Sequence, residues 1–563
     1  MAAGLLVGAA LQPAADSIEP SAIKIKVGLI FYVGRVQPIP PMRPSVKRGG
    51  KNYFFSYGDG LACFRSTQNR MKISIQALMA KSGVAFGTSG ARGPVTAMTD
   101  SVCCAYAMGF LQYLESIGEI RREGGRVAVG GDFRSSTGRV MEAVCRAADD
   151  LGYRAINCGK IPSPAVALFG LENKIPSIMV TGSHIPDDRN GIKFNKCAGE
   201  VLKSDEKGMS SQVVELDDAL FGADGNFAKA KAPHEVSPEA GENYVMRYLN
   251  FFSHDALKGL RVGVYQHSAV GRDVLVKILS HLGAEVTPLG RSEKFIPVDT
   301  EAIRPEDVKL AAEWAATGKF DALVSADGDS DRPLVSDEKG NWLRGDIAGI
   351  LCAKFLAADS ISTPVSCNTA VEKCGWFRDI RRTRIGSPFV VASMMEATAG
   401  GAKRVVGYEA NGGFLLNSDI ETGGKRLRAL PTRDAVIVML GILLLAKSQR
   451  QKISELAASL PARFTASDRL KDFATEKSAA ILARFDSGSE AADKTAIEKM
   501  FGNICGIVAG LNRTDGLRIT FANEEVIHLR PSGNAPEFRC YAEAATDGRA
   551  REITSLALAK VLG

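Results

Sequence analysis

The chain has 563 residues, of which 45% are apolar and 24% charged. These proportions are typical of globular proteins and exclude wholesale disorder or a fibre, and the length predicts roughly four domains. The net charge of +7 is concentrated in residues 1–70, which hold nine Lys/Arg against three Asp/Glu. Because the remainder is close to neutral, we expect no nucleic-acid partner.

Residues 1–70 contain Pro-Ile-Pro-Pro at 38–41 and show no sustained helical or strand period. We predict a disordered or non-native extension, with the native fold beginning at Met71. A mitochondrial-type transit peptide is the alternative, because the segment is basic and poor in acidic residues, but it shows no amphipathic Arg-rich helix.

The longest near-continuous apolar run extends from Ala435 to Ala446. A bilayer-spanning helix needs about 20 such residues, so this run predicts a core helix and no membrane partner. The eleven cysteines include no C-x-x-C pair, which indicates a reducing compartment and a cytoplasmic location. No protein partner is indicated.

From Met71 onward, short apolar strands alternate with helical segments, which predicts an α/β fold with mixed or parallel sheets. The pattern of strand, polar turn, helix and strand occurs three times, starting near Arg126, Arg261 and Pro364, and therefore suggests three related domains. Short alternating strands after Gly516 and a helix from Gly548 predict a smaller α+β domain at the end. The predicted domains span 71–235, 236–344, 345–460 and 461–563, with linkers near Lys231, Arg344 and Ser459.

The first loop that could carry reactive groups is Thr181-Gly-Ser183-His184-Ile-Pro, which follows the predicted strand Ile178-Met-Val. It therefore lies at the carboxyl end of a strand, where α/β proteins collect their sites. Small neighbours predict an accessible Ser183 hydroxyl. An ordinary loop serine is the plain alternative, and a Ser-His-Asp hydrolase is disfavoured by the chain order.

The second loop carries Asp327, Asp329 and Asp331, followed by Arg332 and Pro333. Three carboxylates at alternate positions can converge on one hard cation. An EF-hand calcium loop is disfavoured because its sixth position would be Arg332 instead of glycine and because the flanks read as strands. Mg²⁺ fits better, since it uses few carboxylates and leaves coordination to water and phosphate.

Two further loops are suited to a phosphorylated sugar. Glu409 and Asn411, in Gly-Tyr-Glu-Ala-Asn-Gly-Gly, could bind sugar hydroxyls, although the sequence also suits an ordinary turn. The last loop combines guanidinium groups, a hydroxyl and turn amides that suit a phosphate dianion, with solvated arginines as the alternative. Its candidate residues are Arg530, Ser532, Gly533, Asn534 and Arg539.

Taken together, the four loops and the opening motif Phe86-Gly-Thr-Ser-Gly-Ala-Arg92 resemble the α-D-phosphohexomutase family from about Val84 to the C-terminus. Ser183 matches the phosphoserine, although Gly182 and Ile185 depart from the usual Thr-Ala-Ser-His-Asn-Pro. The resemblance implies three related α/β domains and a smaller C-terminal domain around a central cleft.

The family also implies roles for individual residues. Its Mg²⁺ site, one per active site, would be formed by Ser183, Asp327, Asp329 and Asp331. The catalytic set would be completed by Arg92, His184, Arg332 and Lys193, with Lys193 accepting a proton if neighbouring cations depress its pKa. The sugar and phosphate loops would hold the substrate through the residues named above, although Asn411, Asn534 and Ala535 depart from the commonest forms.

The reaction implied is reversible transfer of phosphate between O6 and O1 of a hexose, through phospho-Ser183 and a hexose 1,6-bisphosphate that also serves as activator. Hexose phosphates are the expected partners. The sugar loop looks most like that of bacterial phosphomannomutases, so mannose ranks first, dual mannose and glucose activity second, and glucosamine third. A non-catalytic sugar-phosphate binder is the alternative outside the enzyme class, and a calcium-binding protein is a distant third.

Overall fold

The structure is a computed structural model that describes residues 70–87, 90–532 and 536–562. The predicted extension lies outside the described residues except for its last residue, because strand β1 (Arg70–Ser74) already includes Arg70. β1 pairs antiparallel with β9 (Val213–Asp217), with Arg70 opposite Asp217.

The first α/β domain is built on a mixed sheet of strand order β2-β3-β7-β6-β4-β5, with β8 paired to β7. Its strands are β2 (Ala85–Phe86), β3 (Ala91–Pro94), β4 (Arg126–Gly131), β5 (Arg154–Lys160), β6 (Ser177–Val180), β7 (Arg189–Lys196) and β8 (Gly199–Glu200). Its helices are α1 (Ile75–Ser82), α2 (Asp100–Ser116), α3 (Thr137–Asp150), α4 (Ser163–Asn173) and α5 (Lys203–Ser210), followed by the 3₁₀ turn Asp218–Leu220.

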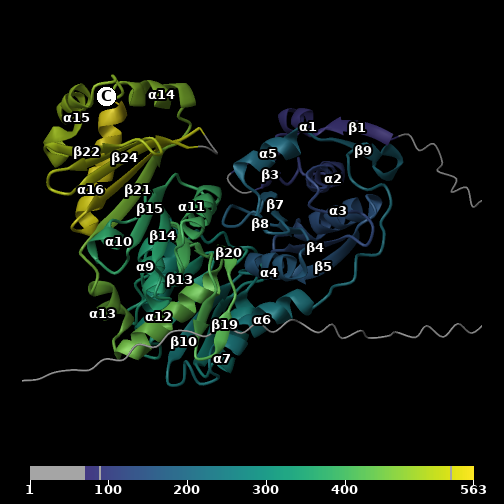
Figure 1. Ribbon diagram of the computed structural model, residues 1–563, viewed down its shortest axis with the longest axis horizontal. Helices are drawn as coiled ribbons and strands as arrows, with labels where there is room; N and C mark the ends of the chain where they lie inside the picture. Colours follow the sequence, from purple (N-terminus) through teal and green to yellow (C-terminus); the bar gives the residue numbers. More distant parts are fainter. Residues whose placement is uncertain (1–69, 88–89, 533–535, 563) are drawn as a thin grey trace, which may run out of the picture. The chain divides into compact units, whose positions relative to one another are not determined.

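Helices cover both faces of this sheet, and the sequence of β4 explains how (Figure 1). Val127 and Val129 point into the core formed with α2 and α3. Ala128, between them, joins the core that includes Val166 and Phe169 of α4. Successive strand residues face opposite sides, so a fully apolar run suits a strand buried on both faces.

The second and third domains repeat the same arrangement with smaller sheets. Their strand orders are β11-β10-β12-β13 and β15-β14-β16-β17-β20. The strands are β10 (Arg261–His267), β11 (Glu285–Arg291), β12 (Ala322–Ala326), β13 (Pro333–Val335), β14 (Ser360–Pro364), β15 (Asp379–Thr383), β16 (Val405–Tyr408), β17 (Phe414–Leu416) and β20 (Leu430–Arg433), with β18 (Ile420–Thr422) and β19 (Lys425–Leu427) forming a separate hairpin. The helices are α6 (Glu239–Phe251), α7 (Arg272–His281), α8 (Pro305–Ala315), α9 (Gly345–Phe355), α10 (Ala370–Lys373), α11 (Ser387–Ala399), α12 (Ala435–Gln449) and α13 (Ile453–Ala458).

The three domains share one connection pattern. In each, three parallel strands are followed by an antiparallel one, in the orders β5-β4-β6-β7, β11-β10-β12-β13 and β15-β14-β16-β17. The predicted serine, acidic and sugar loops each join the third parallel strand to the antiparallel strand. The prediction of three related α/β domains is therefore confirmed, and the loops predicted to carry chemistry occupy equivalent positions in them.

Helix α12 is buried around its whole circumference from Ala435 to Leu443. It belongs to a core shared by the second and third domains, which includes Val264 of β10, Val324 of β12 and Val406 of β16. The prediction that this apolar run is a core helix is confirmed. In the part of the chain that is described, no helix is long and apolar enough to cross a membrane.

The C-terminal domain is a five-stranded antiparallel sheet of order β21-β25-β24-β23-β22 (Figure 1). Its strands are β21 (Phe464–Leu470), β22 (Val508–Asn512), β23 (Leu517–Phe521), β24 (Val526–Pro531) and β25 (Phe538–Ala544), and its helices are α14 (Thr475–Ala483), α15 (Glu490–Cys505) and α16 (Asp547–Leu562). The α+β prediction is confirmed, and β21 and β22 are additions to the three predicted strands.

One local prediction was wrong. The third repeat begins with β14 at Ser360, four residues before the predicted Pro364, because polar residues such as Ser360 and Ser362 are buried there and hid the strand. The predicted linker near Arg344 lies directly before α9, whose N-cap is Arg344.

Candidate active site

Ser183 lies in the loop between β6 and β7, in the left-handed region of backbone space, with φ of +57°. Its amide donates to Thr181 Oγ1 over 2.7 Å, and Thr181 Oγ1 in turn donates to Asp132 Oδ2 over 2.7 Å. The prediction that the Ser183 hydroxyl is accessible is wrong in this structure. Ser183 is fully buried, because the acidic loop covers it and Gly328 lies close to its carbonyl.

Arg134 holds the same loop from behind, and sequence reasoning missed it. Its guanidinium donates to the Ser183 carbonyl over 2.8 Å and pairs with Asp132 at 3.2 Å, and both side chains are fully buried. A Cβ at Gly182 would lie 2.6 Å from Arg134 Cζ. Glycine therefore replaces the usual alanine of this motif where the guanidinium packs against the backbone.

The acidic loop joins β12 to β13 and brings Asp327, Asp329 and Asp331 together, with one oxygen of each within 4.8 Å of the others. All three are buried. Ser183 Oγ donates to Asp327 Oδ2 over 2.6 Å, so the serine and acidic loops meet. Burial, reinforced by the neighbouring carboxylates, holds the pKa of Asp327 well above its usual range.

Lys193, on β7, completes this cluster. Its Nζ lies 2.5 Å from Asp329 Oδ2 and 2.8 Å from Asp331 Oδ2. Burial alone would lower the pKa of Lys193, but the two carboxylates outweigh it and the pKa lies above its usual value. The hypothesis that neighbouring cations depress this pKa is therefore wrong in this geometry, because Lys193 faces anions.

The cluster suits a small, hard divalent cation. Asp329 Oδ1 and Asp331 Oδ1 are buried and have no hydrogen-bond partner among the described residues. Asp331 Oδ1 has a cation nearby in Arg332, whose Nε is 3.7 Å away, but buried carboxylate oxygens without a hydrogen bond carry a large desolvation cost that a bound cation would offset. Oxygen-only donors at this spacing are those that Mg²⁺ uses. The flanking elements are strands, which agrees with the rejection of an EF-hand.

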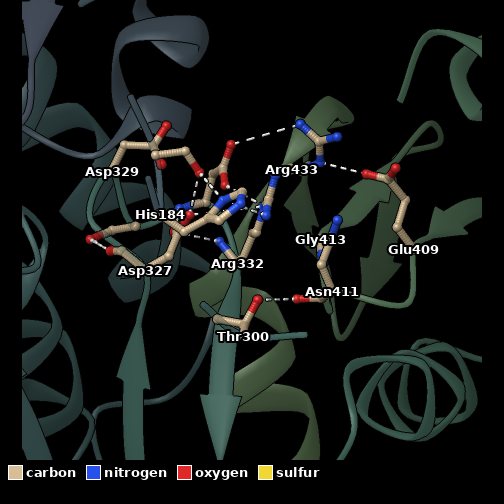
Figure 2. A network of polar contacts seen from close by, with 12 residues as sticks. His184, Thr300, Asp327, Asp329, Arg332, Glu409, Asn411, Gly413 and Arg433 are labelled. Carbon is tan, nitrogen blue, oxygen red and sulfur yellow. Dashed lines mark hydrogen bonds and ion pairs between the residues drawn. The ribbon is translucent and has the colours of Figure 1, made fainter. Parts of the chain in front are cut away.

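Arg332 and His184 lie beside the serine. Arg332 Nη1 donates to His184 Nδ1 over 2.9 Å, and the same ring nitrogen is 3.3 Å from Ser183 Oγ (Figure 2). Burial, together with the charge of Arg332, lowers the pKa of His184 to about 3. His184 is therefore a neutral imidazole whose Nδ1 accepts a hydrogen bond, which assigns its tautomer.

Arg92 comes from β3 and lines the cleft in front of these groups. Burial, then repulsion from Arg332, lowers its pKa to about 10, so it stays protonated at neutral pH. Its Nε is buried without a partner in the described structure. A guanidinium with unused donors is suited to a phosphate oxygen.

The sugar loop folds as a tight turn between β16 and β17. The Glu409 amide donates to the Gly413 carbonyl over 3.0 Å, and Asn411 Oδ1 accepts from the Gly413 amide over 2.9 Å. Thr300 Oγ1 donates to the Asn411 carbonyl over 2.6 Å (Figure 2). Sequence reasoning missed Arg433, which pairs with Glu409 at 2.5 Å.

In the C-terminal domain, Arg530 on β24 lies directly opposite Arg539 on β25. Arg530 Nε is 3.3 Å from Asp515 Oδ1, and Arg539 pairs with Glu537 at 2.9 Å. Ser532 closes the turn, since its amide donates to the Glu537 carbonyl over 2.8 Å. The predicted contributors Gly533 and Asn534 lie outside the described residues, as do Thr88 and Ser89 of the opening motif.

These loops line one cleft of about 830 Å³. Its lining includes nine Lys/Arg against five Asp/Glu, which favours an anionic ligand. The predicted residues that line it are Arg92, His184, Arg332, Glu409, Asn411, Arg530, Ser532 and Arg539. Lining residues that sequence reasoning did not identify include Lys203, Asp299, Glu301, Arg384, Arg469 and Lys471. Ser183 and the three aspartates do not line the cleft in this structure, but Ser183 contacts His184 and Asp327 contacts Arg332, and both of these partners line it.

The chain matches four models of one family: phosphoglucomutase/phosphomannomutase α/β/α domains I, II and III at residues 83–218, 242–340 and 344–464, and the C-terminal domain at 477–557. Relatives include a phosphomannomutase of Salmonella muenchen, 42% identical over 85% of this chain and 96% of its own, and one of Sinorhizobium fredii, 42% identical over 85% and 98%. A phosphoglucosamine mutase of Clostridium acetobutylicum is 25% identical over 67% of this chain and 81% of its own.

Solved structures share the fold at low identity. A phosphoglucomutase/phosphomannomutase family protein of Burkholderia thailandensis has a TM-score of 0.63 at 19% identity, covering 87% of this chain and 97% of its own. The open form of the Paramecium phosphoglucomutase parafusin has a TM-score of 0.63 at 15% identity, covering 84% and 94%. With four domains matched in order and the serine, acidic and sugar loops on equivalent turns, the chain belongs to the phosphoglucomutase/phosphomannomutase family, the α-D-phosphohexomutases.

Proposed function

We propose that this chain is a phosphomannomutase that interconverts mannose 6-phosphate and mannose 1-phosphate through a phosphoserine enzyme and a 1,6-bisphosphate intermediate. The observation that carries the proposal is the contact of Ser183 Oγ with Asp327, 2.6 Å away, within a buried three-carboxylate cluster. A nucleophile placed on an acidic cluster suits phosphoryl transfer, which depends on position and charge. The 42% identity to two phosphomannomutases supports mannose as the sugar.

In the proposed cycle, phospho-Ser183 donates its phosphoryl group to a hydroxyl of the bound sugar monophosphate. The Ser183 Oγ–P bond breaks as the sugar O–P bond forms, and the proton lost by the attacking sugar hydroxyl is balanced by protonation of the departing Ser183 Oγ, which regains the hydroxyl that donates to Asp327 in this structure. The bisphosphate then turns over in the cleft, and its other phosphoryl group returns to Ser183. Phosphoryl transfer spreads negative charge over three oxygens, so Arg92 and Arg332 supply positive charge where it develops.

Mg²⁺, held by Asp327, Asp329, Asp331 and the phosphorylated Ser183, would neutralise charge on the transferring group when bound. Lys193 fixes the orientation of Asp329 and Asp331 in this structure and supplies a further positive charge. Neutral His184 accepts a hydrogen bond from Arg332 and so orients it toward the serine.

The sugar loop and the C-terminal domain hold the rest of the substrate. Glu409 and Asn411 bind ring hydroxyls, while Arg530, Ser532 and Arg539, with Gly533 and Asn534, hold the phosphate that is not reacting. Holding it at a fixed distance lets either end of the sugar face Ser183. The C-terminal domain closes over the substrate to exclude water, which would otherwise hydrolyse the phosphoserine.

The sugar preference is the finer part of the proposal. A coupled assay should compare mannose, glucose and glucosamine 1-phosphates, with Mg²⁺ and catalytic hexose 1,6-bisphosphate as activator. We expect the highest kcat/KM with mannose 1-phosphate, then glucose, then glucosamine. Intact-mass analysis should find one phosphate, on Ser183. No turnover of any of the three sugars, with no phosphate on Ser183, would favour the non-catalytic binder instead.

We also propose that the predicted domain boundaries hold and that residues 1–70 are dispensable. A chain starting at Met71 should keep full activity and the same Tm, since Arg70 contributes only the first pair of the β1–β9 ladder and a partly exposed ion pair with Asp150 at 3.7 Å. Loss of folding would contradict this. A cytoplasmic location is proposed because the ten described cysteines are all unpaired thiols.

A further inference from the structure

A buried ion pair underlies the sugar loop. Arg433 Nε donates to Glu409 Oε2 over 2.5 Å, and each side chain is only 5% exposed (Figure 2). Arg433 ends the edge strand β20, and Glu409 lies in the turn between β16 and β17, so the pair ties this edge strand to the sugar loop. None of the hydrogen bonds in the described chain uses Glu409 Oε1, which leaves that oxygen for a ligand in the cleft that Glu409 lines.

The same guanidinium reaches toward the acidic loop. Arg433 Nη1 lies 4.0 Å from Asp331 Oδ2. The rigid, planar guanidinium of Arg433 therefore lies between the sugar loop and the acidic loop. A guanidinium presents its donors in a fixed fork, so it can set the distance between two carboxylates, which a lysine ammonium cannot do as well.

Gly413 provides the space for this side chain. A Cβ at Gly413 would lie 2.5 Å from Arg433 Cδ and 2.9 Å from its Nε. The Gly413 backbone is outside the left-handed region, so backbone conformation does not require glycine here. The space that Arg433 occupies does require it, because a Cβ would overlap this side chain. Glycine at this position and arginine at 433 therefore form a matched pair.

The backbone around Arg433 is anchored on both sides. Thr432 Oγ1 donates over 2.6 Å to Glu200 of the first domain. Asp434 caps α12 and accepts over 2.6 Å from Tyr244 of α6. The two residues that flank Arg433 are thus each bonded to another part of the chain. Such contacts fix the backbone from which Arg433 projects, which is the support expected for a side chain that positions another group.

We propose that Arg433 is a positioning residue that aims the Glu409 carboxylate at the sugar and fixes the sugar loop relative to the acidic loop, with Gly413 as the residue that makes room for it. The inference rests on the proposed function and adds a residue that determines how the sugar is held. It acts through Glu409, without forming or breaking a bond itself.

The test uses Gly413→Ala, Arg433→Lys and Arg433→Met, with Gly138→Ala as the matched control, since a Cβ at Gly138 on α3 meets nothing within 4 Å. We expect Gly413→Ala and Arg433→Met to lower kcat/KM for mannose 1-phosphate at least ~30-fold, mostly through KM, because a buried charge loses its partner. Arg433→Lys should recover part of the loss. The control should match the parent.

A second measurement separates positioning from mere support of the fold. In a Glu409→Gln background, adding Arg433→Met should lower kcat/KM by less than a further ~3-fold. The effects of two residues that act through one another are not additive. Full additivity, or unchanged kcat/KM in Gly413→Ala, would overturn the inference. If Arg433→Met fails to fold, Gly413→Ala and Arg433→Lys still decide the question.

Failure of the proposed function can be recognised separately. In a Ser183→Ala background, which removes turnover, calorimetry should show mannose 1-phosphate binding at least ~10-fold more weakly when Gly413→Ala is added. If Gly413→Ala leaves the affinity for mannose 1-phosphate unchanged, the inference about Arg433 is wrong even if the parent is an active mutase. Weakened binding in a chain without mutase activity supports it while the catalytic proposal fails.

Discussion

The half of the cleft that we propose carries the chemistry differs from the half that we propose holds phosphate in how its side chains are fixed. Around Ser183, Asp327 and Asp329 the side chains are fully buried, and Thr181 and Arg134 add bonds to the serine backbone. In the C-terminal domain, the Arg530 and Arg539 side chains are 13% and 31% exposed.

The two halves of the cleft also differ in the groups that their charged side chains contact. The reactive half is bonded within itself across the first two domains, so its geometry exists before any substrate binds. The arginines of the C-terminal half are paired with Asp515 and Glu537, carboxylates that a phosphate dianion would have to displace or share. Preorganised charge suits a transition state, whereas exchangeable pairs suit a ligand that must also leave.

The largest expected effect comes from the nucleophile. Ser183→Ala should lower kcat by at least ~10³-fold, because no phosphoenzyme can form. The measurement is the coupled mannose 1-phosphate assay together with intact mass, which should show no phosphate. Ser211→Ala, an exposed serine at the end of α5, is the control and should retain parental activity. A Ser183→Ala chain that isomerises hexose phosphates at the parental rate would refute the mechanism.

Removal of one acidic side chain should come next. Asp329→Asn keeps the shape but removes the charge that pairs with Lys193, and we expect ~10²-fold or greater loss of Mg²⁺-dependent turnover. Titration of Mg²⁺ into EDTA-treated protein should show a higher half-saturation concentration. Asp218→Asn, which is exposed, is the control. Unchanged Mg²⁺ dependence in Asp329→Asn would overturn the metal assignment.

Substitution in the C-terminal half should have a smaller effect. Arg530→Met removes one of several phosphate donors, so we expect a ~10-fold rise in KM with kcat less affected. Arg551→Met, on the exposed face of α16, serves as the control. An equal loss of kcat at saturating substrate would mean that Arg530 belongs with the chemistry, and the contrast between the two halves would be lost.

The sequence was sufficient for the fold and for most of the cleft. Strand–loop patterns placed Ser183, Asp327 and Glu409 after strands, and the repeat predicted three related domains, because residues close in sequence determine strands and turns. Loops that occupy equivalent positions in related domains meet in one cleft, so the local motifs could be assembled into a site.

What the sequence could not supply depends on contacts between distant residues. Arg134 reaches the Ser183 carbonyl 49 positions away, and Arg433 reaches Glu409 across 24. Neither lies in a recognisable motif. The accessibility of Ser183 and the direction of the Lys193 pKa were predicted wrongly for the same reason, since both depend on the acidic loop folding against them.

The smallest expected effect concerns stability and His528, which lies on β24, the same strand as Arg530. His528 Nε2 donates to the Asp515 carbonyl over 2.5 Å, and its ring stacks on Tyr541. Burial lowers its pKa to about 4, helped by the charges of Arg530 and Arg518 and opposed by Asp515. The folded chain therefore keeps this imidazole neutral where the unfolded chain, with an ordinary pKa near 6.5, binds a proton.

The free energy of unfolding should thus fall as the pH falls from 6.5 toward 4 and recover as the pH rises. Between pH 6.5 and 5.5 the contribution of His528 is about 1 kcal/mol. Urea unfolding of His528→Gln, which keeps a side-chain donor, should show a pH dependence shallower by that amount, whereas His281→Gln on the surface of α7 should not differ from the parent. Parallel pH curves for His528→Gln and the parent would mean that this imidazole is charged in the fold. The C-terminal half would then carry a further cation on the same strand as Arg530, the proposed phosphate ligand, and the proposed exchange of phosphate there would need another explanation.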